Sequence, residues 1–298
     1  MAALELVHLA GSSFVVPGPT NIGVIESGTE AILVDSGNDK DMGRKLLRLC
    51  EDKGLKLKAI VNTHSNADHI GGNQYLQKNT GCRILSSKGE KPFIESPAIE
   101  ASFLWGGFPV GELDNKFFRA EASTVTDLFG EPGCPDIGGS KIVALPGHFF
   151  DMIGVLTKDG VFYMADCLFG RRVLEKHGIP FIYDVSAYKE TIRMVQGVEA
   201  EFFVMSHGEV QRDIVPLALE NLDIVRRVED SILDIVKMER GFEGILKEVC
   251  DRFGIGLDCG RYALVGSTIR SFLTCLRNEN RIGFRFHDNA MLWSDSMG

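Results

Sequence analysis

The segment from Thr63 to Gly72 constrains the fold of this chain more than any other stretch. Its sequence is Thr-His-Ser-Asn-Ala-Asp-His-Ile-Gly-Gly, and its ligand-type residues are His64, Asn66, Asp68 and His69. The apolar run 59–61 before it predicts a buried strand, and residues 74–78 after it predict a helix. A polar cluster at a strand-to-helix turn is typical of a site on an α/β scaffold. Because alternate residues of an extended turn point to one side, we expect these side chains to converge.

The imidazole and carboxylate groups of this segment predict a metal site. Zinc prefers such ligands, with iron and manganese as competitors. The two glycines, Gly71 and Gly72, are expected to let the backbone turn tightly before the helix. The alternative is a polar loop in which Asp68 caps the helix. That interpretation does not explain the two histidines that flank the carboxylate.

Three further ligand-type residues stand where predicted strands end. These residues are His148, Asp166 and His207. The runs before them are apolar, and Asp159-Gly160 predicts a hairpin turn between two of the strands. A lone histidine is more often structural. Three ligand-type residues that recur at strand ends, after a cluster of four, predict a common site.

The order of these residues resembles the signature of the metallo-β-lactamase superfamily, which is His-x-His-x-Asp-His followed by His, Asp and His. The flanks Leu-Pro-Gly-His148 and Met-Ala-Asp166 are similar to those of the family, and the resemblance covers about residues 1–215. Asn66 stands where the family has its second histidine. The resemblance implies an α/β fold, an αββα sandwich of two mixed sheets flanked by helices.

The resemblance also implies two metal positions. The first would be held by His64, Asn66 and His148, and the second by Asp68, His69 and His207, with Asp166 bridging both. Two ions about 3.5–4 Å apart share a hydroxide nucleophile in such sites, and Asp68 is our candidate catalytic residue. Asp35, in the family-like Asp35-Ser36-Gly37, is expected to support the metal loop without ligating. The alternative for Asp35 is a helix cap.

A neutral amide at position 66 is a poorer zinc ligand than imidazole. Three outcomes follow for Asn66. Its oxygen ligates and favours manganese or iron, its amide binds a water on the metal, or the first metal position is weak. One or two ions per chain are therefore expected, zinc first, with iron or manganese as alternatives.

Two segments supply candidate substrate contacts. Residues 96–140, rich in glycine, proline and aromatics, predict an insertion that covers the metal cleft like a lid, with Trp105 and Phe108 lining an apolar pocket. The alternative is a surface subdomain or a dimer contact. The predicted loop 168–184 carries Arg171, Arg172, His177 and Tyr183, which could orient an anionic substrate. The alternative is a solvated run of charge.

Residues 216–298 predict a helical module after the catalytic domain, residues 1–215. Pro216 suits the first turn of a long amphipathic helix, and two helices and a β-hairpin follow. This order resembles a winged helix, which some members of the superfamily carry. Basic and acidic residues balance from Gly241 onward, which argues against nucleic-acid binding. Packing on the catalytic domain and contact with a second copy in a homodimer are the alternatives.

Composition bounds the partners and the compartment. The net charge of −9 over 298 residues argues against nonspecific binding to nucleic acid or an anionic membrane. No apolar run approaches the ~20 residues that span a bilayer. The seven cysteines show no Cys-x-x-Cys spacing, and the N-terminus lacks the pattern of a secretory signal. We therefore expect a cytoplasmic protein with reduced thiols and a small-molecule substrate.

Together these features predict a hydrolase that uses a metal-bound hydroxide on a small ester, thioester or related acyl substrate. One alternative is an iron-dependent redox or oxygen-handling protein on the same fold. Another is a non-catalytic, metal-binding sensor with a degraded site. A nuclease is disfavoured by the charge. The fold alone does not select the substrate.

Overall fold

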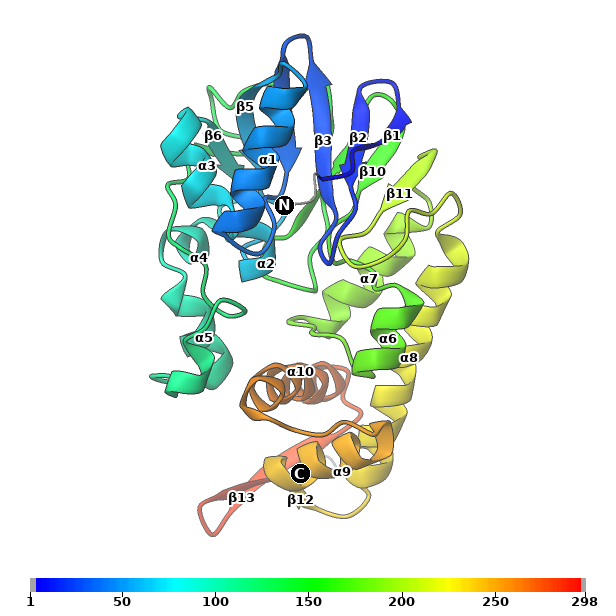
Figure 1. The fold of residues 1–298 in the computed structure, drawn as a ribbon. Helices are drawn as coiled ribbons and strands as arrows, with labels where there is room; N and C mark the ends of the chain where they lie inside the picture. Colours follow the sequence, from blue (N-terminus) through cyan, green and yellow to red (C-terminus); the bar gives the residue numbers. More distant parts are fainter. Residues whose placement is uncertain (1–3, 296–298) are drawn as a thin grey trace.

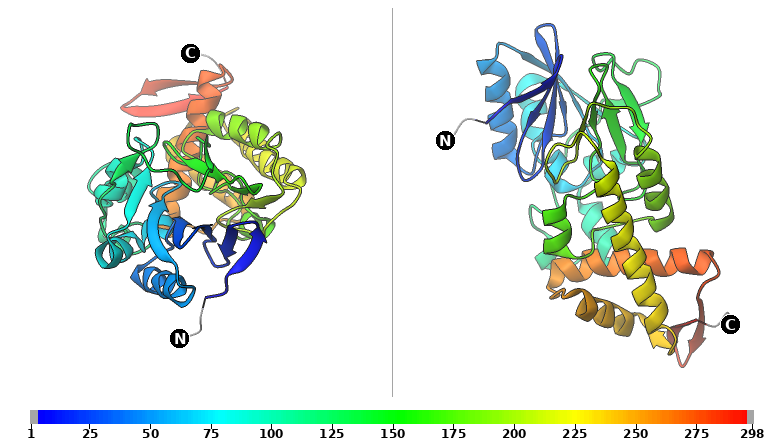
Figure 2. Two further views of the ribbon diagram at one scale, coloured as in Figure 1. Left: turned by 90° about the horizontal axis from the view of Figure 1, so that it is seen from above. Right: turned by 90° about the vertical axis from the view of Figure 1, so that its right-hand side faces the viewer.

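Two β-sheets pack face to face in the structure, with helices on their outer sides (Figures 1 and 2). The computed structural model describes residues 4–295. The first sheet consists, in spatial order, of β1 (Val7–Ala10), β2 (Ser13–Val16), β3 (Ile22–Ser27), β4 (Glu30–Val34), β5 (Lys56–Val61), β6 (Arg83–Ser86) and β7 (Asp127–Leu128). The second has the order β11-β10-β9-β8, with β8 (Lys141–Ala144), β9 (Ile153–Leu156), β10 (Val161–Tyr163) and β11 (Phe202–Val204). The predicted αββα sandwich is confirmed.

The first sheet is antiparallel at its N-terminal side and parallel beyond it. Strands β1 to β4 are antiparallel neighbours, and β4 to β7 are parallel. Parallel neighbours need crossover connections, and the helices here are α1 (Lys40–Asp52), α2 (Ala67–Ile70), α3 (Asn73–Thr80), α4 (Lys91–Glu95) and α5 (Ala98–Trp105). Helix α1 begins where the Asp39 side chain accepts a hydrogen bond from the Met42 amide.

Strand β4 illustrates why the sheets are buried on both faces. Its alternate residues Ile32 and Val34 belong to the core between the two sheets. Ala31 and Leu33 point the other way, into the apolar cluster that includes Leu46 of α1. A strand covered on both sides appears in the sequence as a continuous apolar run, as this one does.

Two segments that the sequence predicts as irregular contain regular structure. The predicted loop 168–184 contains helix α6 (Arg171–His177), between Gly170 and Gly178. A helix of two turns is too short to show apolar periodicity, which explains the wrong prediction. Within residues 96–140 lie α5, the 3-10 turn η1 (Gly111–Leu113) and β7, which pairs with β6.

The segment that carries the motif is helical where the sequence predicts an extended turn. Asp68 and His69 lie on α2, whose N-cap is Asn66. Asp68 is therefore not the helix cap. Gly71 and Gly72 form the expected turn before α3, but their φ values of −61° and −85° are ordinary, so the turn does not require the conformational freedom of glycine.

Close packing explains why a glycine stands at position 71. A Cβ atom on Gly71 would lie 2.3 Å from the carbonyl carbon of Asn38, which is backbone and cannot move cheaply. Gly71→Ala should therefore lower the free energy of unfolding by about 1–3 kcal/mol or more, measured by urea denaturation. Gly244→Ala is the control, because a Cβ there meets only Arg240 Cδ at 3.7 Å and helix propensity should stabilise it by ~0.5–1 kcal/mol. Equal stability of the two variants would contradict the packing argument.

Residues 215–295 add three helices and a three-stranded sheet. The elements are α8 (Val215–Ile235), β12 (Arg240–Gly241), α9 (Phe242–Phe253), α10 (Cys259–Asn278), β13 (Gly283–His287) and β14 (Ala290–Ser294). Their sheet has the order β12-β14-β13. Phe272 and Trp293 belong to the same apolar cluster as Phe162 of β10 and Tyr188 of α7 (Val185–Val195), so these elements share a core with the second sheet. The winged-helix interpretation stays a prediction.

Within the described residues 4–295, no helix is both long enough and apolar enough to cross a membrane.

Candidate metal centre

The seven predicted metal ligands lie next to one another because each comes at or soon after the end of a strand. His64 follows β5, Asn66, Asp68 and His69 lie at or on α2, and His148, Asp166 and His207 follow β8, β10 and β11. Ala165 has a φ of 51°, a left-handed conformation that non-glycine residues seldom adopt. This residue turns the chain directly before Asp166.

Asp166 lies at the centre of the cluster. Its Oδ2 is 3.3 Å from His207 Nε2 and 3.7 Å from His148 Nε2, and its Oδ1 is 3.6 Å from His69 Nε2. Within this cluster, two groups have ligand atoms close enough together to hold an ion. One is His64, His69 and Asp166, and the other is Asp68, His69 and His207. His69 belongs to both groups, whereas the family order places it with the second metal only.

The backbone fixes the ring orientation of two of the histidines. His148 Nδ1 lies 2.9 Å from the Phe181 carbonyl oxygen, and His207 Nδ1 lies 2.7 Å from that of Pro19. A carbonyl oxygen only accepts, so the ring proton is on Nδ1 and Nε2 keeps its lone pair. His148 Nε2 faces Asn66 Oδ1 at 3.0 Å.

Asp35 fixes the other two rings in the same way. His69 Nδ1 lies 2.8 Å from Asp35 Oδ2, which also accepts a hydrogen bond of 2.7 Å from the Thr63 hydroxyl. That hydroxyl lies 3.0 Å from His64 Nδ1, and its hydrogen is already donated to Asp35, so it accepts from His64. Helix α1 is capped by Asp39 and not by Asp35. All four Nε2 atoms are thus left free to ligate.

Three buried ligand atoms have no hydrogen-bond partner in the part of the chain that the structure describes. They are His64 Nε2, His69 Nε2 and Asp166 Oδ1. A buried polar atom without a partner costs ~1–3 kcal/mol. Three such atoms around one space are explained by a bound cation, for which imidazole nitrogens and carboxylate oxygens are suitable ligands. The residues therefore fit a metal ion.

The local electrostatics hold Asp166 and His64 in the protonation states that bind metal. Burial alone would raise the pKa of Asp166, but the neighbouring histidines, His207 first, hold that pKa well below its usual value. Burial and the neighbouring His69 lower the pKa of His64 well below its usual value. Ionised carboxylates and neutral imidazoles are the forms that ligate. Burial alone would lower the pKa of His69 and His207, but the neighbouring carboxylates raise it, to about 9 for His69, so a cation must displace a proton from these two rings.

Two buried glutamates support the motif segment, and neither is singled out by the sequence. Glu90 accepts hydrogen bonds from the Ser65 amide and hydroxyl and from the Asp151 amide. Burial raises the pKa of Glu90 to about 7. Glu100 accepts a hydrogen bond of 2.8 Å from Asn66 Nδ2. Glu90 lies in a polar stretch that resembles solvent-exposed sequence, and Glu100 is a single charge in a mostly apolar stretch, where a carboxylate is usually expected to face solvent.

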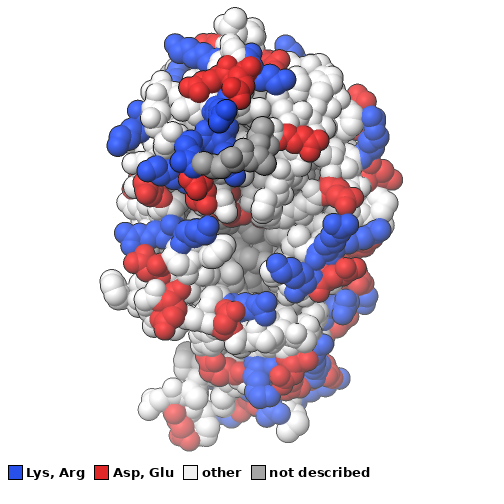
Figure 3. Space-filling model, in the orientation of Figure 1, with Lys and Arg blue, Asp and Glu red and all other residues white. Residues whose placement is uncertain are grey.

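A cavity of about 800 Å³ lies beside the ligand His207, and its lining includes Arg171 and Arg172. Figure 3 shows that one face of the molecule is hollowed near its centre and carries interspersed basic and acidic side chains. Arg171 is held by Glu220, with its Nε 2.8 Å from both carboxylate oxygens. Arg172 is 91% exposed, and its side chain lies 3.8 Å from that of Glu209. Arg172 is thus the freer cation of the two.

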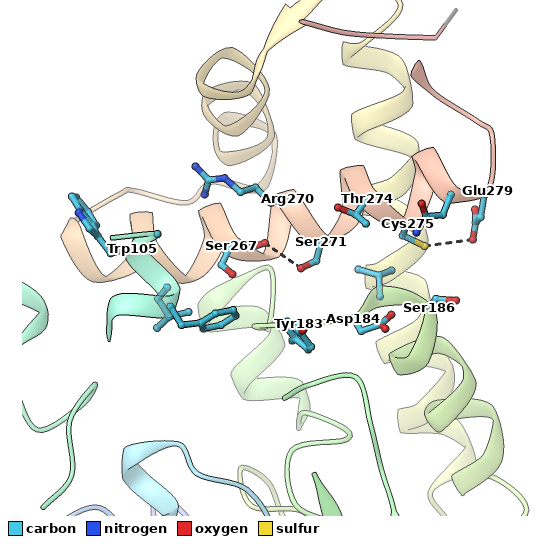
Figure 4. A pocket seen from close by; sticks show the side chains of 15 residues that line it. Trp105, Tyr183, Asp184, Ser186, Ser267, Arg270, Ser271, Thr274, Cys275 and Glu279 are labelled. Carbon is cyan, nitrogen blue, oxygen red and sulfur yellow. Dashed lines mark hydrogen bonds between the residues drawn. The ribbon is translucent and has the colours of Figure 1, made fainter. Parts of the chain in front are cut away.

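The other predicted substrate contacts lie elsewhere. Trp105 and Tyr183 line a different cavity, of about 900 Å³, between α5, residues 183–186 and α10 (Figure 4). Phe108 is 96% exposed, so it does not line an apolar pocket here. His177 is an exposed residue at the end of α6. The sequence shows which residues are aromatic or basic, but it does not show which way the insertion folds.

The apolar wall of the site is formed by aromatic rings that no sequence motif marks. The ring centroid of Phe149 lies 6.3 Å from that of His64, Phe181 lies 5.5 Å from His148, and Phe169 stacks on His207 at 6.5 Å. Phe149 and Phe169 follow the ligands His148 and Asp166 within three residues. Their proximity in sequence is the one signal that could have identified them.

Relatives and a solved structure are similar to this chain, over coverages that range from less than half to nearly all of its length. An atrochrysone carboxyl ACP thioesterase of Aspergillus fumigatus is 22% identical over 92% of this chain and 81% of its own length. A hydroxyacylglutathione hydrolase of Pelagibacter ubique is 38% identical, over 43% of this chain and 46% of its own. The crystal structure of a metallo-beta-lactamase family protein from Thermus thermophilus shares the fold, with a TM-score of 0.73, 16% identity and coverage of 97% and 98% of the two chains.

The family pattern extends across the strands and loops that carry the ligands. The family model described as "Metallo-beta-lactamase superfamily" matches residues 15–207, which is more than half of the chain and runs from β2 to the last ligand. The chain belongs to the metallo-β-lactamase superfamily.

Proposed function

We propose that this chain is a metal-dependent hydrolase of small acyl thioesters, with zinc as its ion. The observation that carries the proposal is the convergence of four histidine Nε2 atoms and two carboxylates, three of whose atoms are buried without a hydrogen-bond partner in the described residues. The thioester class is supported by the similarity to proteins named as a thioesterase and a hydroxyacylglutathione hydrolase. Esters and related acyl compounds are the neighbouring class.

Different residues of the chain would have different roles in such a reaction. One or two ions would be held by the seven candidate ligands, which are His64, Asn66, Asp68, His69, His148, Asp166 and His207. A metal ion held there supplies a water-derived nucleophile at neutral pH and polarises the acyl carbonyl. The aromatic wall of Phe149, Phe169 and Phe181 excludes water from one side of the site. Arg172, beside the cavity next to His207, attracts an anionic group of the substrate.

Asp68 is the candidate catalytic carboxylate. Its Oδ2 accepts a hydrogen bond of 2.9 Å from the Thr20 hydroxyl and lies 3.2 Å from His207 Nε2. Burial would raise the pKa of Asp68, but His69 and His207 hold that pKa below its usual value. An ionised carboxylate in this position either ligates or accepts a proton, and both roles are part of the proposal.

A substrate panel tests the proposal on purified protein. We expect turnover of acyl thioesters to exceed that of p-nitrophenyl esters, and β-lactams and phosphodiesters to be poor substrates. A chelator should abolish the activity, and zinc should restore it, with metal content measured by elemental analysis on the same samples. Preference for phosphodiesters, or activity that survives complete metal removal, would contradict the proposal.

The ligand set also favours a second candidate for the ion. Asn66, Asp68 and Asp166 supply oxygen donors beside the four histidines. Oxygen donors favour harder ions such as manganese and iron. Predominant iron in protein purified without added metal would move the iron-dependent redox alternative ahead of the hydrolase.

A further inference from the structure

We infer that Glu100 is a positioning residue that turns the amide oxygen of Asn66, and not its nitrogen, toward the metal site. The chain departs from the family signature at Asn66, and an amide side chain ligates a cation through its oxygen. The two ends of an asparagine amide are almost equal in shape, so a neighbour must select the orientation. The inference rests on the proposed metal site and adds to it a residue from outside the signature.

The two ends of the Asn66 amide have different neighbours. Nδ2 donates to Glu100 Oε1 at 2.8 Å. Oδ1 lies 3.0 Å from His148 Nε2. The ring proton of His148 is on Nδ1, which donates to the Phe181 carbonyl. In a neutral ring, Nε2 then offers a lone pair, so two acceptor atoms face one another with no hydrogen between them.

A cation beside these two atoms explains their approach. Metal–ligand distances of about 2.0–2.2 Å place two ligands of one ion roughly 3 Å apart. The opposite orientation of the amide would donate Nδ2–H to His148 Nε2 and would need no metal. That orientation turns the Asn66 oxygen toward Glu100. Burial raises the pKa of Glu100 well above its usual value, but a cation bound at the neighbouring site favours the ionised form, which only accepts hydrogen bonds. Glu100 therefore opposes the orientation that cannot ligate.

The packing of α5 holds Glu100 in place. The Glu100 side chain is buried, with 5% exposed. Ala101 and Leu104 of the same helix pack in a cluster that includes Ala263 of α10. Phe103 packs against this cluster too, and its ring centroid lies 5.1 Å from that of Phe150. A carboxylate on a packed helix can orient its partner, because its own movement is restricted. The 96–140 segment thus contributes directly to the metal site.

Metal titration of the full chain tests this role. Apo-protein is titrated with Zn²⁺ against a chromophoric chelator, and with Co²⁺ while its visible spectrum is recorded. Glu100→Met removes the acceptor and should weaken one metal position by ~10–100-fold and change the Co²⁺ spectrum. Glu100→Gln keeps an acceptor oxygen but adds an N–H₂ donor that can pair with the Asn66 oxygen, so its metal affinity should fall between those of wild type and Glu100→Met. Asp223→Asn, which neutralises an exposed carboxylate paired with Arg226 on α8, is the control and should leave metal affinity unchanged.

The same substitution of Glu100 in an Asn66→Asp variant distinguishes a positioning role of Glu100 from a general structural effect. In Asn66→Asp both ends of the side chain are oxygens, so no orientation has to be selected. Adding Glu100→Met to that variant should not weaken metal binding. Equal weakening in the wild-type and Asn66→Asp backgrounds, or no weakening in either, would overturn the inference. Wild-type protein that binds no metal would instead overturn the proposed function.

Discussion

Asp166→Asn is expected to reduce acyl-thioester hydrolysis by more than about 100-fold and to lower the metal content of the purified protein. Asp166 Oδ1 is buried without a hydrogen-bond partner in the described residues, and Oδ2 lies within 3.7 Å of His148 and His207. Asparagine replaces one anionic oxygen with an N–H₂ group, which cannot ligate a cation. Loss of an outer-shell partner typically costs about 10–100-fold, so loss of the central ligand should cost more.

The measurement is kcat/KM together with metal per chain on the same samples. Asp223→Asn is the matched control, because Asp223 is an exposed aspartate whose partner is Arg226 on the same helix. It should leave activity and metal content unchanged, since exposed ion pairs contribute little. An Asp166→Asn protein that keeps its metal and its activity would show that the cluster is not the catalytic centre.

The sequence predicts that the candidate ligands lie close together, because strand ends are marked by their pattern. A buried strand is a continuous apolar run, and a polar residue directly after it lies at the edge of the sheet. The runs before His64 and His207 are mostly buried strands that end three residues earlier, whereas β8 before His148 is only partly buried. The fold then brings the strand ends together, so residues far apart in the chain meet in one cluster.

Tertiary contacts that leave no periodic pattern are not predictable in this way. The acceptors for His148 and His207 are backbone carbonyls of Phe181 and Pro19, and every residue carries a carbonyl. Glu100 is buried only because the 96–140 segment folds back against Asn66. Local sequence preferences contain no information on such contacts.

Asp35→Asn is expected to weaken metal binding by ~10–100-fold while the protein stays folded. Asp35 Oδ1 accepts from the Thr63 amide, which requires the asparagine oxygen at that position. The asparagine N–H₂ then takes the place of Oδ2, which in the wild type lies 2.8 Å from His69 Nδ1, and it faces that nitrogen. Because that group donates, His69 must accept at Nδ1 and carry its proton on Nε2. The lone pair that should reach the ion is thereby lost.

The reversed proton on His69 separates this effect from simple destabilisation. In protein labelled with ¹⁵N-histidine, the ring nitrogen shifts should show the proton on Nδ1 in the wild type and on Nε2 in Asp35→Asn. Asp39→Asn is the control, since asparagine caps a helix as well as aspartate does and Asp39 touches no ligand histidine in the described residues. A protein with Asp35→Asn that binds metal normally would mean that the ring orientation is set by packing and not by this carboxylate.

Thr63→Val should give a smaller loss of metal affinity than Asp35→Asn. It removes the acceptor of His64 but leaves the hydrogen bond between Asp35 and His69 in place.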